Sequence, residues 1–158
     1  MDKGVQETMA DGVLAGFPME DVKVAVYDGS YHSVDSNEMA FKTAARIGFR
    51  AACEKANPVL LEPMANMAIT VPEEYAGSIM SDISTRRGRI VGTDSDDAGD
   101  TVILVRVPYA EVVTYTKDLR SISRGTGSYT IDLEGYEEAP AHITKKMVEE
   151  YEASRNQG

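Results

Sequence analysis

The chain has 158 residues, which is long enough for one ordinary domain or two small ones. Hydrophobic residues make up 42% and charged residues 27%, the balance of a folded soluble protein, and no apolar run approaches the ~20 residues that a membrane span needs. The net charge of −10 argues against nucleic acid as a general partner, and the single cysteine, Cys53, excludes an internal disulfide and fits a reducing, cytoplasmic environment.

The first 60 residues predict two helices and one strand. Residues 1–12 have the pattern of a short helix, and residues 21–27 alternate as a strand with one buried face does. A longer helix, for which Asp35 offers an N-cap, runs to about residue 56 along one apolar stripe. The apolar side chains of the predicted strand are Val22, Val24 and Val26. One strand and two helices cannot complete a sheet, so this half of the chain is predicted to be incomplete.

Residues 61–139 show a β-α-β-β-α-β order. This order favours the ferredoxin-like plan, an antiparallel four-stranded sheet with two helices on one face. Each of the two helices ends in Arg-Gly, where Gly88 and Gly125 are expected to act as C-terminal caps. The predicted core contains Ile79, Met80, Ile83, Val105, Leu119, Ile122 and Ile131. A last helix is predicted after Pro140, within residues 140–158.

Two clusters of basic side chains stand out from the acidic background. They are Arg86, Arg87 and Arg89, and Lys117, Arg120 and Arg124. Because a planar guanidinium suits phosphate, an acidic protein with such local patches can dock on RNA at chosen points. Arginines near helix C-termini are also favoured by the helix macrodipole alone. The residues by themselves leave both explanations open.

His32 lies on the loop between the predicted strand and the long helix, next to Tyr31. An imidazole there can stack on a base or bond to phosphate, or it can simply hydrogen-bond within its own loop to Asp28 or Asp35. A hydrolytic triad of Ser30, His32 and Asp35 is not expected, because residues so close in one loop rarely reach that geometry. With two histidines and one thiol in the chain, no metal site is predicted.

Several stretches resemble elongation factor G, in order and without large gaps. Those similar to the second half of its fourth domain are Gly16-Phe17-Pro18, Asp21-Val22-Lys23-Val24, Tyr27-Asp28-Gly29-Ser30-Tyr31-His32 and Ala40-Phe41-Lys42. Those similar to its fifth domain are Leu60-Leu61-Glu62-Pro63, Pro72-Glu73-Glu74-Tyr75, Arg86-Arg87-Gly88 and Asp118-Leu119-Arg120-Ser121. The similarity covers nearly the whole chain.

The resemblance implies an α+β protein with three parts. Residues 1–60 would be an incomplete α/β segment like the second domain of ribosomal protein S5, residues 61–139 a ferredoxin-like domain, and residues 140–158 a helix that returns to the first part. The implied role is the C-terminal, ribosome-binding part of a translocase, with Tyr31 and His32 near the tRNA–mRNA pairing at the decoding site. The six basic residues named above would contact large-subunit rRNA.

The resemblance further implies that this chain catalyses nothing. The family's GTP hydrolysis needs a P-loop, and no G-x-x-x-x-G-K-[ST] occurs here. No cofactor is therefore expected in the chain, since GTP and Mg²⁺ would belong to the GTPase domain of a full-length parent. Arg124-Gly125-Thr126-Gly127 departs from the family's usual Gln-Gly-Arg-Gly, so the main translocase and a paralogue, including the ribosomal-protection type, both stay open.

A different function, a free-standing ferredoxin-like module for regulation or small-ligand binding, is the alternative. An RNA-recognition motif is disfavoured because the strands offer only Tyr129 for base stacking. Two further expectations are structural. Arg86 and Arg87 should be exposed, and residues 1–60 should be either poorly ordered or completed by a second copy in a homodimer.

Overall fold

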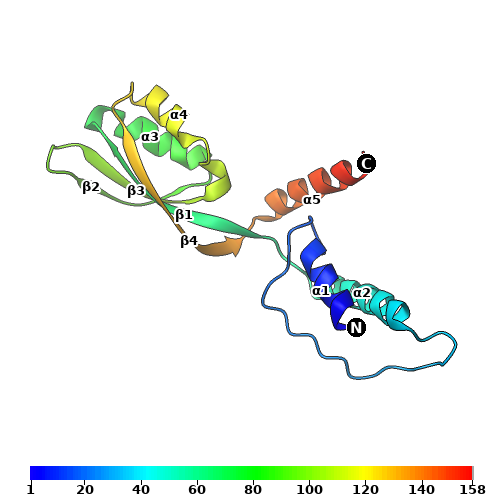
Figure 1. The fold of residues 1–158 in the computed structure, drawn as a ribbon. Coiled ribbons are helices and arrows are strands. Elements are labelled where there is room, and N and C mark those ends of the chain that lie inside the picture. Colours follow the sequence, from blue (N-terminus) through cyan, green and yellow to red (C-terminus); the bar gives the residue numbers. More distant parts are fainter. Residues whose placement is uncertain (158) are drawn as a thin grey trace. The chain divides into compact units, whose positions relative to one another are not determined.

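The computed structural model describes residues 1–157, and the chain forms two units (Figure 1). Unit 1 contains Met1–Leu60 together with the chain from Ala139 onward, and unit 2 is Leu61–Glu138. No helix within residues 1–157 combines the length and the apolarity that crossing a bilayer requires.

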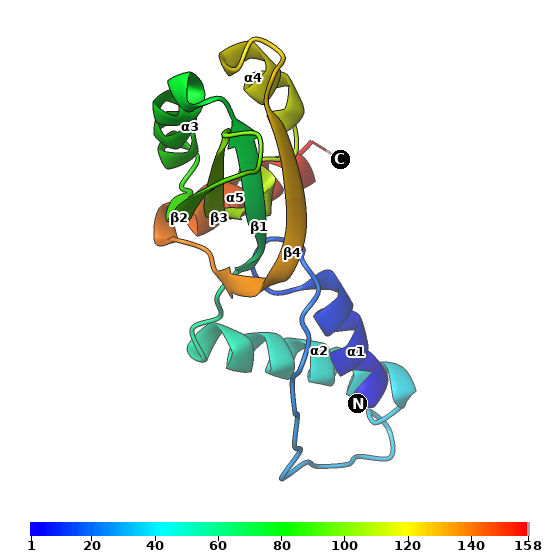
Figure 2. The same cartoon turned by 90° about the vertical axis from the view of Figure 1, so that its left-hand side faces the viewer.

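Unit 2 is a four-stranded antiparallel sheet with helices on one face. Its elements are β1 Leu61–Val71, α3 Glu73–Thr85, β2 Arg89–Ser95, β3 Thr101–Pro108, the short 3-10 helix η1 Tyr109–Glu111, α4 Tyr115–Ile122 and β4 Ser128–Glu138. The strand order is β2-β3-β1-β4, which Figure 2 shows side by side. In Figure 1, α3 and α4 lie over the same face of the sheet. The predicted ferredoxin-like fold is confirmed.

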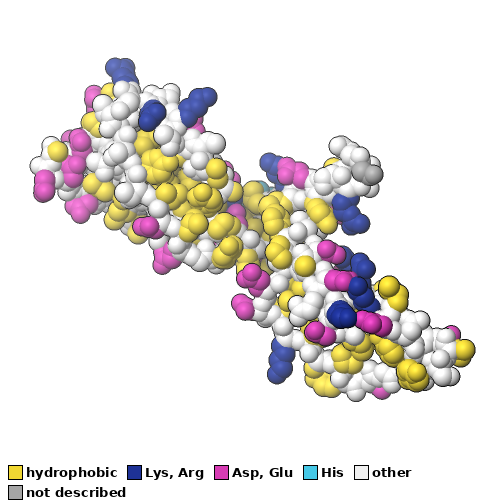
Figure 3. Space-filling model, viewed as in Figure 1, with side chains coloured by type: hydrophobic (Ala, Val, Ile, Leu, Met, Phe, Trp, Pro, Cys, Tyr) yellow, Lys and Arg dark blue, Asp and Glu magenta, His cyan; other side chains and the backbone are white. Residues whose placement is uncertain are grey.

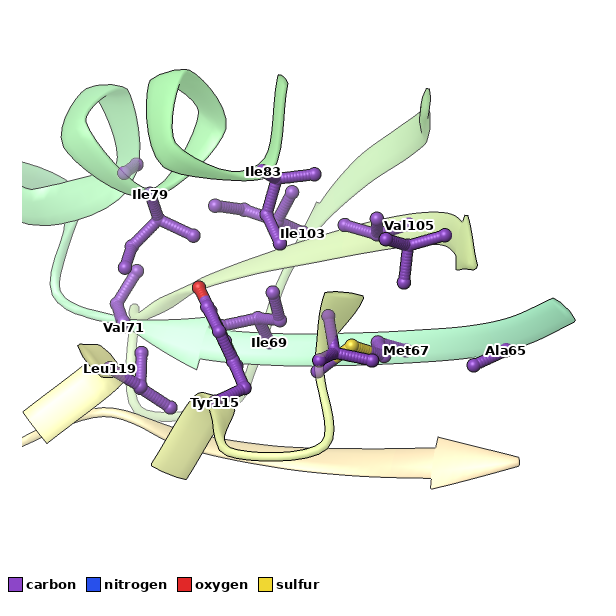
Figure 4. Packing of buried hydrophobic residues seen from close by; sticks show 13 residues of the cluster. Ala65, Met67, Ile69, Val71, Ile79, Ile83, Ile103, Val105, Tyr115 and Leu119 are labelled. Carbon is purple, nitrogen blue, oxygen red and sulfur yellow. The ribbon is translucent and has the colours of Figure 1, made fainter. Parts of the chain in front are cut away.

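The core of unit 2 lies between the sheet and the two helices. Successive strand residues point to opposite faces, so the odd-numbered side chains of β1, from Ala65 to Val71, share the helix-covered face. On this face they lie beside the odd-numbered side chains of the neighbouring strand β3. Figure 4 shows Ile79 and Ile83 of α3 reaching down to this layer, with Tyr115 and Leu119 closing it from the side of α4. Of the predicted core, Ile79, Ile83, Val105 and Leu119 are buried, and Met80, Ile122 and Ile131 are partly buried against them.

Both helices of unit 2 end in the same way, with an arginine in the left-handed conformation. Arg87 has φ 61° and Arg124 has φ 50°, each directly before the glycine that the sequence indicated as the cap. After α3, the N–H of Gly88 donates to the carbonyl of Ile83 at 2.9 Å, which satisfies a carbonyl at the helix end. A Cβ on Gly88 would lie 2.8 Å from that same carbonyl oxygen. Gly88 is thus needed for close approach, while Arg87 makes the left-handed turn.

Within residues 1–157, unit 1 consists of three helices and a long irregular segment. The helices are α1 Asp2–Asp11, α2 Glu38–Lys55 and α5 Ala141–Arg155. One small core forms where Val5 of α1 meets Ala45, Phe49 and Cys53 of α2. A second core gathers Ala15, Leu60 and Ala139 with the apolar side chains of α5, which are Ile143, Met147, Val148 and Tyr151.

The predicted strand at residues 21–27 is not formed. The segment has no regular secondary structure, and Val22, Val24 and Val26 are 38%, 43% and 59% exposed. A strand needs a neighbour for its backbone hydrogen bonds, and within residues 1–157 no other strand belongs to this unit. The cap of α2 also differs from the prediction, because Asn37 accepts the bond from the N–H of Ala40 and Asp35 does not.

Candidate nucleic-acid interface

The loop before α2 presents Tyr31 and His32 to solvent. Its backbone is held by a turn, in which the N–H of His32 donates to the Ser36 hydroxyl at 2.8 Å and the His32 carbonyl accepts from the N–H of Ser36 at 2.8 Å. The Tyr31 ring is 68% exposed and stacks on Phe41 of α2, with centroids 6.3 Å apart and planes 11° from parallel. The backbone and Tyr31 thus have partners within unit 1, while the imidazole of His32 makes no hydrogen bond to any residue in 1–157.

Arg86, at the end of α3, is held inside unit 2. Its guanidinium donates to the carboxylates of Asp82 and Asp118, both at 2.8 Å, and to the backbone oxygen of Glu111 at 3.0 Å. The same group lies 5.1 Å from the centre of the Tyr115 ring, a cation–π contact. Hydrogen bonding to Asp82, and less to Asp118, raises the pKa of Arg86. Its side chain is 19% exposed, so the prediction that it projects into solvent is wrong.

Arg87 is also bound within the unit, in a bidentate pair. Its two terminal nitrogens donate to the two carboxylate oxygens of Glu62 at 2.8 and 2.9 Å, and its Nε donates to Glu111 at 3.1 Å. The side chain is 22% exposed, and the bond to Glu62 is the main cause that raises the pKa of Arg87. The predicted exposure of Arg87 is wrong for the same reason as that of Arg86. These two arginines connect α3 to β1, η1 and α4.

Arg89 does not lie on the same surface as Arg86 and Arg87. It pairs in register with Arg106 of β3, whose neighbours Val105 and Val107 point into the core. Arg89 and Arg106 therefore lie on the face of the sheet opposite the helices, because residues directly opposite in a ladder share a face. Arg89 is exposed. The three arginines look like one cluster in the sequence, but Arg86 and Arg87 form ion pairs within unit 2, whereas Arg89 is exposed to solvent.

The second predicted cluster is a surface patch. Lys117, Arg120 and Arg124 are all exposed, and their spacing along α4 and its end puts them on one side of the helix. None of the three forms an ion pair with a residue in 1–157. Figure 3 shows dark blue side chains over the α4 region of unit 2, whereas Asp and Glu side chains gather at the end where the β2–β3 hairpin turns. This α4 patch is an exposed basic surface of unit 2, and Arg89 is a separate exposed cation on the other face of the sheet.

The thiol of Cys53 and the hydroxyl of Tyr115 are two titratable groups that the fold buries. Cys53 lies between α1 and α2, and its burial raises the pKa of the thiol, as expected for a structural cysteine. Tyr115 is fully buried, its hydroxyl finds no hydrogen-bond partner among residues 1–157, and burial raises its pKa to about 12.

Sequence reasoning missed the acidic partners that hold Arg86 and Arg87. Asp82 is four residues before Arg86 on α3, a spacing at which side chains meet, so this pair could have been read from the sequence. Glu62 and Glu111 are each more than twenty residues away from Arg87, and only the fold brings them together. No local signal would have distinguished Arg87 from a free arginine.

Comparisons with known proteins agree with the fold and with the resemblance read from the sequence. Residues 1–57 match the family model of elongation factor G, domain IV, and residues 59–147 match that of the elongation factor G C-terminus. The crystal structure of ttk003000868 from Thermus thermophilus is 40% identical with a TM-score of 0.75, over 96% of this chain and 23% of that one. This chain thus spans about a quarter of the length of that protein. It belongs to the elongation factor G family and carries the domain IV and C-terminal parts of a translation elongation factor.

Proposed function

We propose that this chain supplies ribosome-contacting surfaces of a translocase of the elongation factor G type. The α4 patch would contact large-subunit rRNA, and the loop of Tyr31 and His32 would contact the tRNA–mRNA pairing at the decoding site. Membership of the family, through matches that together run from residue 1 to residue 147, is the observation that carries the proposal. In this proposal, GTP hydrolysis belongs to domains of the family other than domain IV and the C-terminal domain. No catalytic step is proposed for this chain.

The exposed guanidinium of Arg124 supports a role for the α4 patch. A left-handed conformation costs a non-glycine residue roughly 1 kcal/mol, and Arg124 adopts it at φ 50°. At the equivalent position after α3, the bidentate pair with Glu62 offsets this cost for Arg87. Arg124 has no such ion pair within residues 1–157 and its side chain is exposed. The turn itself is held by the hydrogen bond from the N–H of Gly125 to the carbonyl of Arg120 at 2.8 Å, so the exposed guanidinium of Arg124 is available to a partner outside the chain, such as an RNA phosphate.

The loop of His32 is suited to a nucleic-acid contact in a different way. A turn and the Tyr31–Phe41 stack fix the backbone, so ordering this loop on binding would cost little entropy. The exposed ring of Tyr31 and the unbonded imidazole of His32 supply a stacking surface and a hydrogen-bonding group. Single-stranded RNA is recognised mainly through such stacking and edge contacts.

Sedimentation with purified ribosomes over a salt titration tests the proposal. The double variant Lys117→Ala with Arg120→Ala is expected to weaken binding severalfold and to flatten the log–log salt dependence by about 1 per lost phosphate contact. A matched control is Lys145→Ala with Lys146→Ala, which removes two exposed charges of α5 and should leave binding unchanged. Equal affinities for all three proteins would refute the α4 contact. No ribosome binding at any salt would favour the small-ligand module instead.

A further inference from the structure

The face of the sheet in unit 2 opposite α3 and α4 has a shallow apolar trough. Within residues 61–138 no element covers this face (Figure 2). The register places one residue from each strand in a row across it, namely Gly92, Leu104, Ala68 and Thr130. A hollow of about 460 Å³ lies over the small side chains of Ala68 and Thr130, beside the exposed Leu104 and Val91.

The rim of this trough on the β4 side is acidic. Asp132 and Glu134 line it, and both are exposed. The cation beside them is Arg106, whose guanidinium is engaged by Glu137 at 2.8 Å and by Glu134 at 3.3 Å. The other arginine of this face is the exposed Arg89, which lies on β2 at the far edge of the sheet from β4. Asn66 also donates its amide to Glu134. Asp132 forms no ion pair within residues 1–157, so this rim offers unpaired negative charge to a ligand.

The apolar floor and the acidic rim on the β4 side disfavour nucleic acid at this end of the trough. The row and its acidic rim contain no aromatic ring on which a base could stack. Phosphates would meet Asp132, Glu134 and Glu137, and like charges in contact raise the free energy of a complex. A segment with aliphatic side chains for the trough and lysine or arginine for the rim has the complementary chemistry.

We propose that this sheet face docks a cationic, partly apolar polypeptide segment of another protein. An extended segment of that kind, laid across the strands, would place its aliphatic side chains over Ala68 and Leu104 and a basic side chain against Asp132. This surface is separate from the α4 patch, which lies on the helix side of unit 2, and the inference stands without the ribosome contact proposed above.

Binding of a defined peptide to the full chain tests the docking surface. The probe is a short peptide of alternating lysine and leucine, compared with one of alternating glutamate and leucine and with a single-stranded RNA oligonucleotide. Backbone amide shifts in NMR spectra locate each ligand. The lysine peptide is expected to shift the amides of Ala68, Leu104 and Thr130, and the other two ligands are not.

A matched pair of charge reversals then tests the acidic rim. Asp132→Lys should weaken binding of the lysine peptide about threefold to tenfold, because an exposed attraction becomes a repulsion. Asp97→Lys makes the same change in net charge on the β2–β3 turn and should alter affinity less than twofold at physiological salt, where charges are screened beyond about 8 Å. The proposal is overturned if both variants weaken binding equally, if the peptide shifts map to the helix side or are absent, or if the RNA binds the sheet face.

Discussion

Replacing Arg86 tests whether this arginine stabilises the fold of unit 2. Arg86→Ala removes hydrogen bonds to Asp82, Asp118 and the Glu111 carbonyl, together with the contact over the Tyr115 ring. Hydrogen bonds to charged groups contribute about 1.5–3 kcal/mol each. Water can partly replace Arg86, because the side chains of Asp82 and Asp118 are 23% and 42% exposed. The free energy of unfolding is therefore expected to fall by about 2–4 kcal/mol.

Urea unfolding followed by far-ultraviolet circular dichroism measures this loss. Arg86→Lys keeps the charge but not the planar fork, so it should fall between the wild type and the alanine variant. The control is Arg89→Ala, three residues along, where the side chain is exposed and a change within about 0.5 kcal/mol is expected. If Arg86→Ala is no more destabilising than Arg89→Ala, the ion-pair network does not stabilise the fold and the reasoning fails.

Two further predictions concern Tyr115 and the irregular segment of unit 1. The pKa of Tyr115 is raised from an ordinary 10 to about 12 in the folded chain, so the unfolded chain loses this proton first and stability falls as pH rises from about 10 to 12. Tyr115→Phe should flatten the dependence of stability on pH between about 10 and 12. Because it removes an unpartnered hydroxyl, it should also raise the free energy of unfolding at neutral pH by about 1 kcal/mol. An unchanged alkaline slope would contradict the raised pKa of Tyr115. In hydrogen exchange, amides 21–27 should exchange much faster than those of β1, unless rising protein concentration protects them through pairing with a second copy. A strict monomer by sedimentation, with residues 21–27 as protected as β1, would show that unit 1 closes its own core.

The sequence predicted unit 2 well because local patterns and tertiary packing agree there. The alternating apolar residues of β1 and β3 and the helically spaced apolar residues of α3 all belong to one buried cluster. Each element is therefore favoured both by its local pattern and by its packing. Residues 21–27 carry an equally clean alternation, yet they form no strand. Alternation reports which side chains would be buried in a sheet, but pairing needs a neighbouring strand, which a local pattern cannot supply.

The candidate interface was predictable only in part, for a related reason. Exposure of Lys117, Arg120 and Arg124 follows from the amphipathic pattern of α4, where Tyr115 and Leu119 take the buried side. The surroundings of Arg87 depend on Glu62 and Glu111, which are distant in sequence. Whether an arginine is free for a ligand is decided by carboxylates that the fold brings to it.

The separation of charge within unit 2 has a kinetic consequence. Asp94, Asp96, Asp97 and Asp100 lie in and around the β2–β3 turn, while the α4 patch is cationic (Figure 3). Such a distribution is an electric dipole, and a dipole near a polyanion feels a torque as well as a net force. A net-negative body can therefore be rotated, within about 10 Å of the surface at 0.1 M salt, until its cationic end leads. Orientation during the encounter, more than overall attraction, would then determine which collisions proceed to a complex.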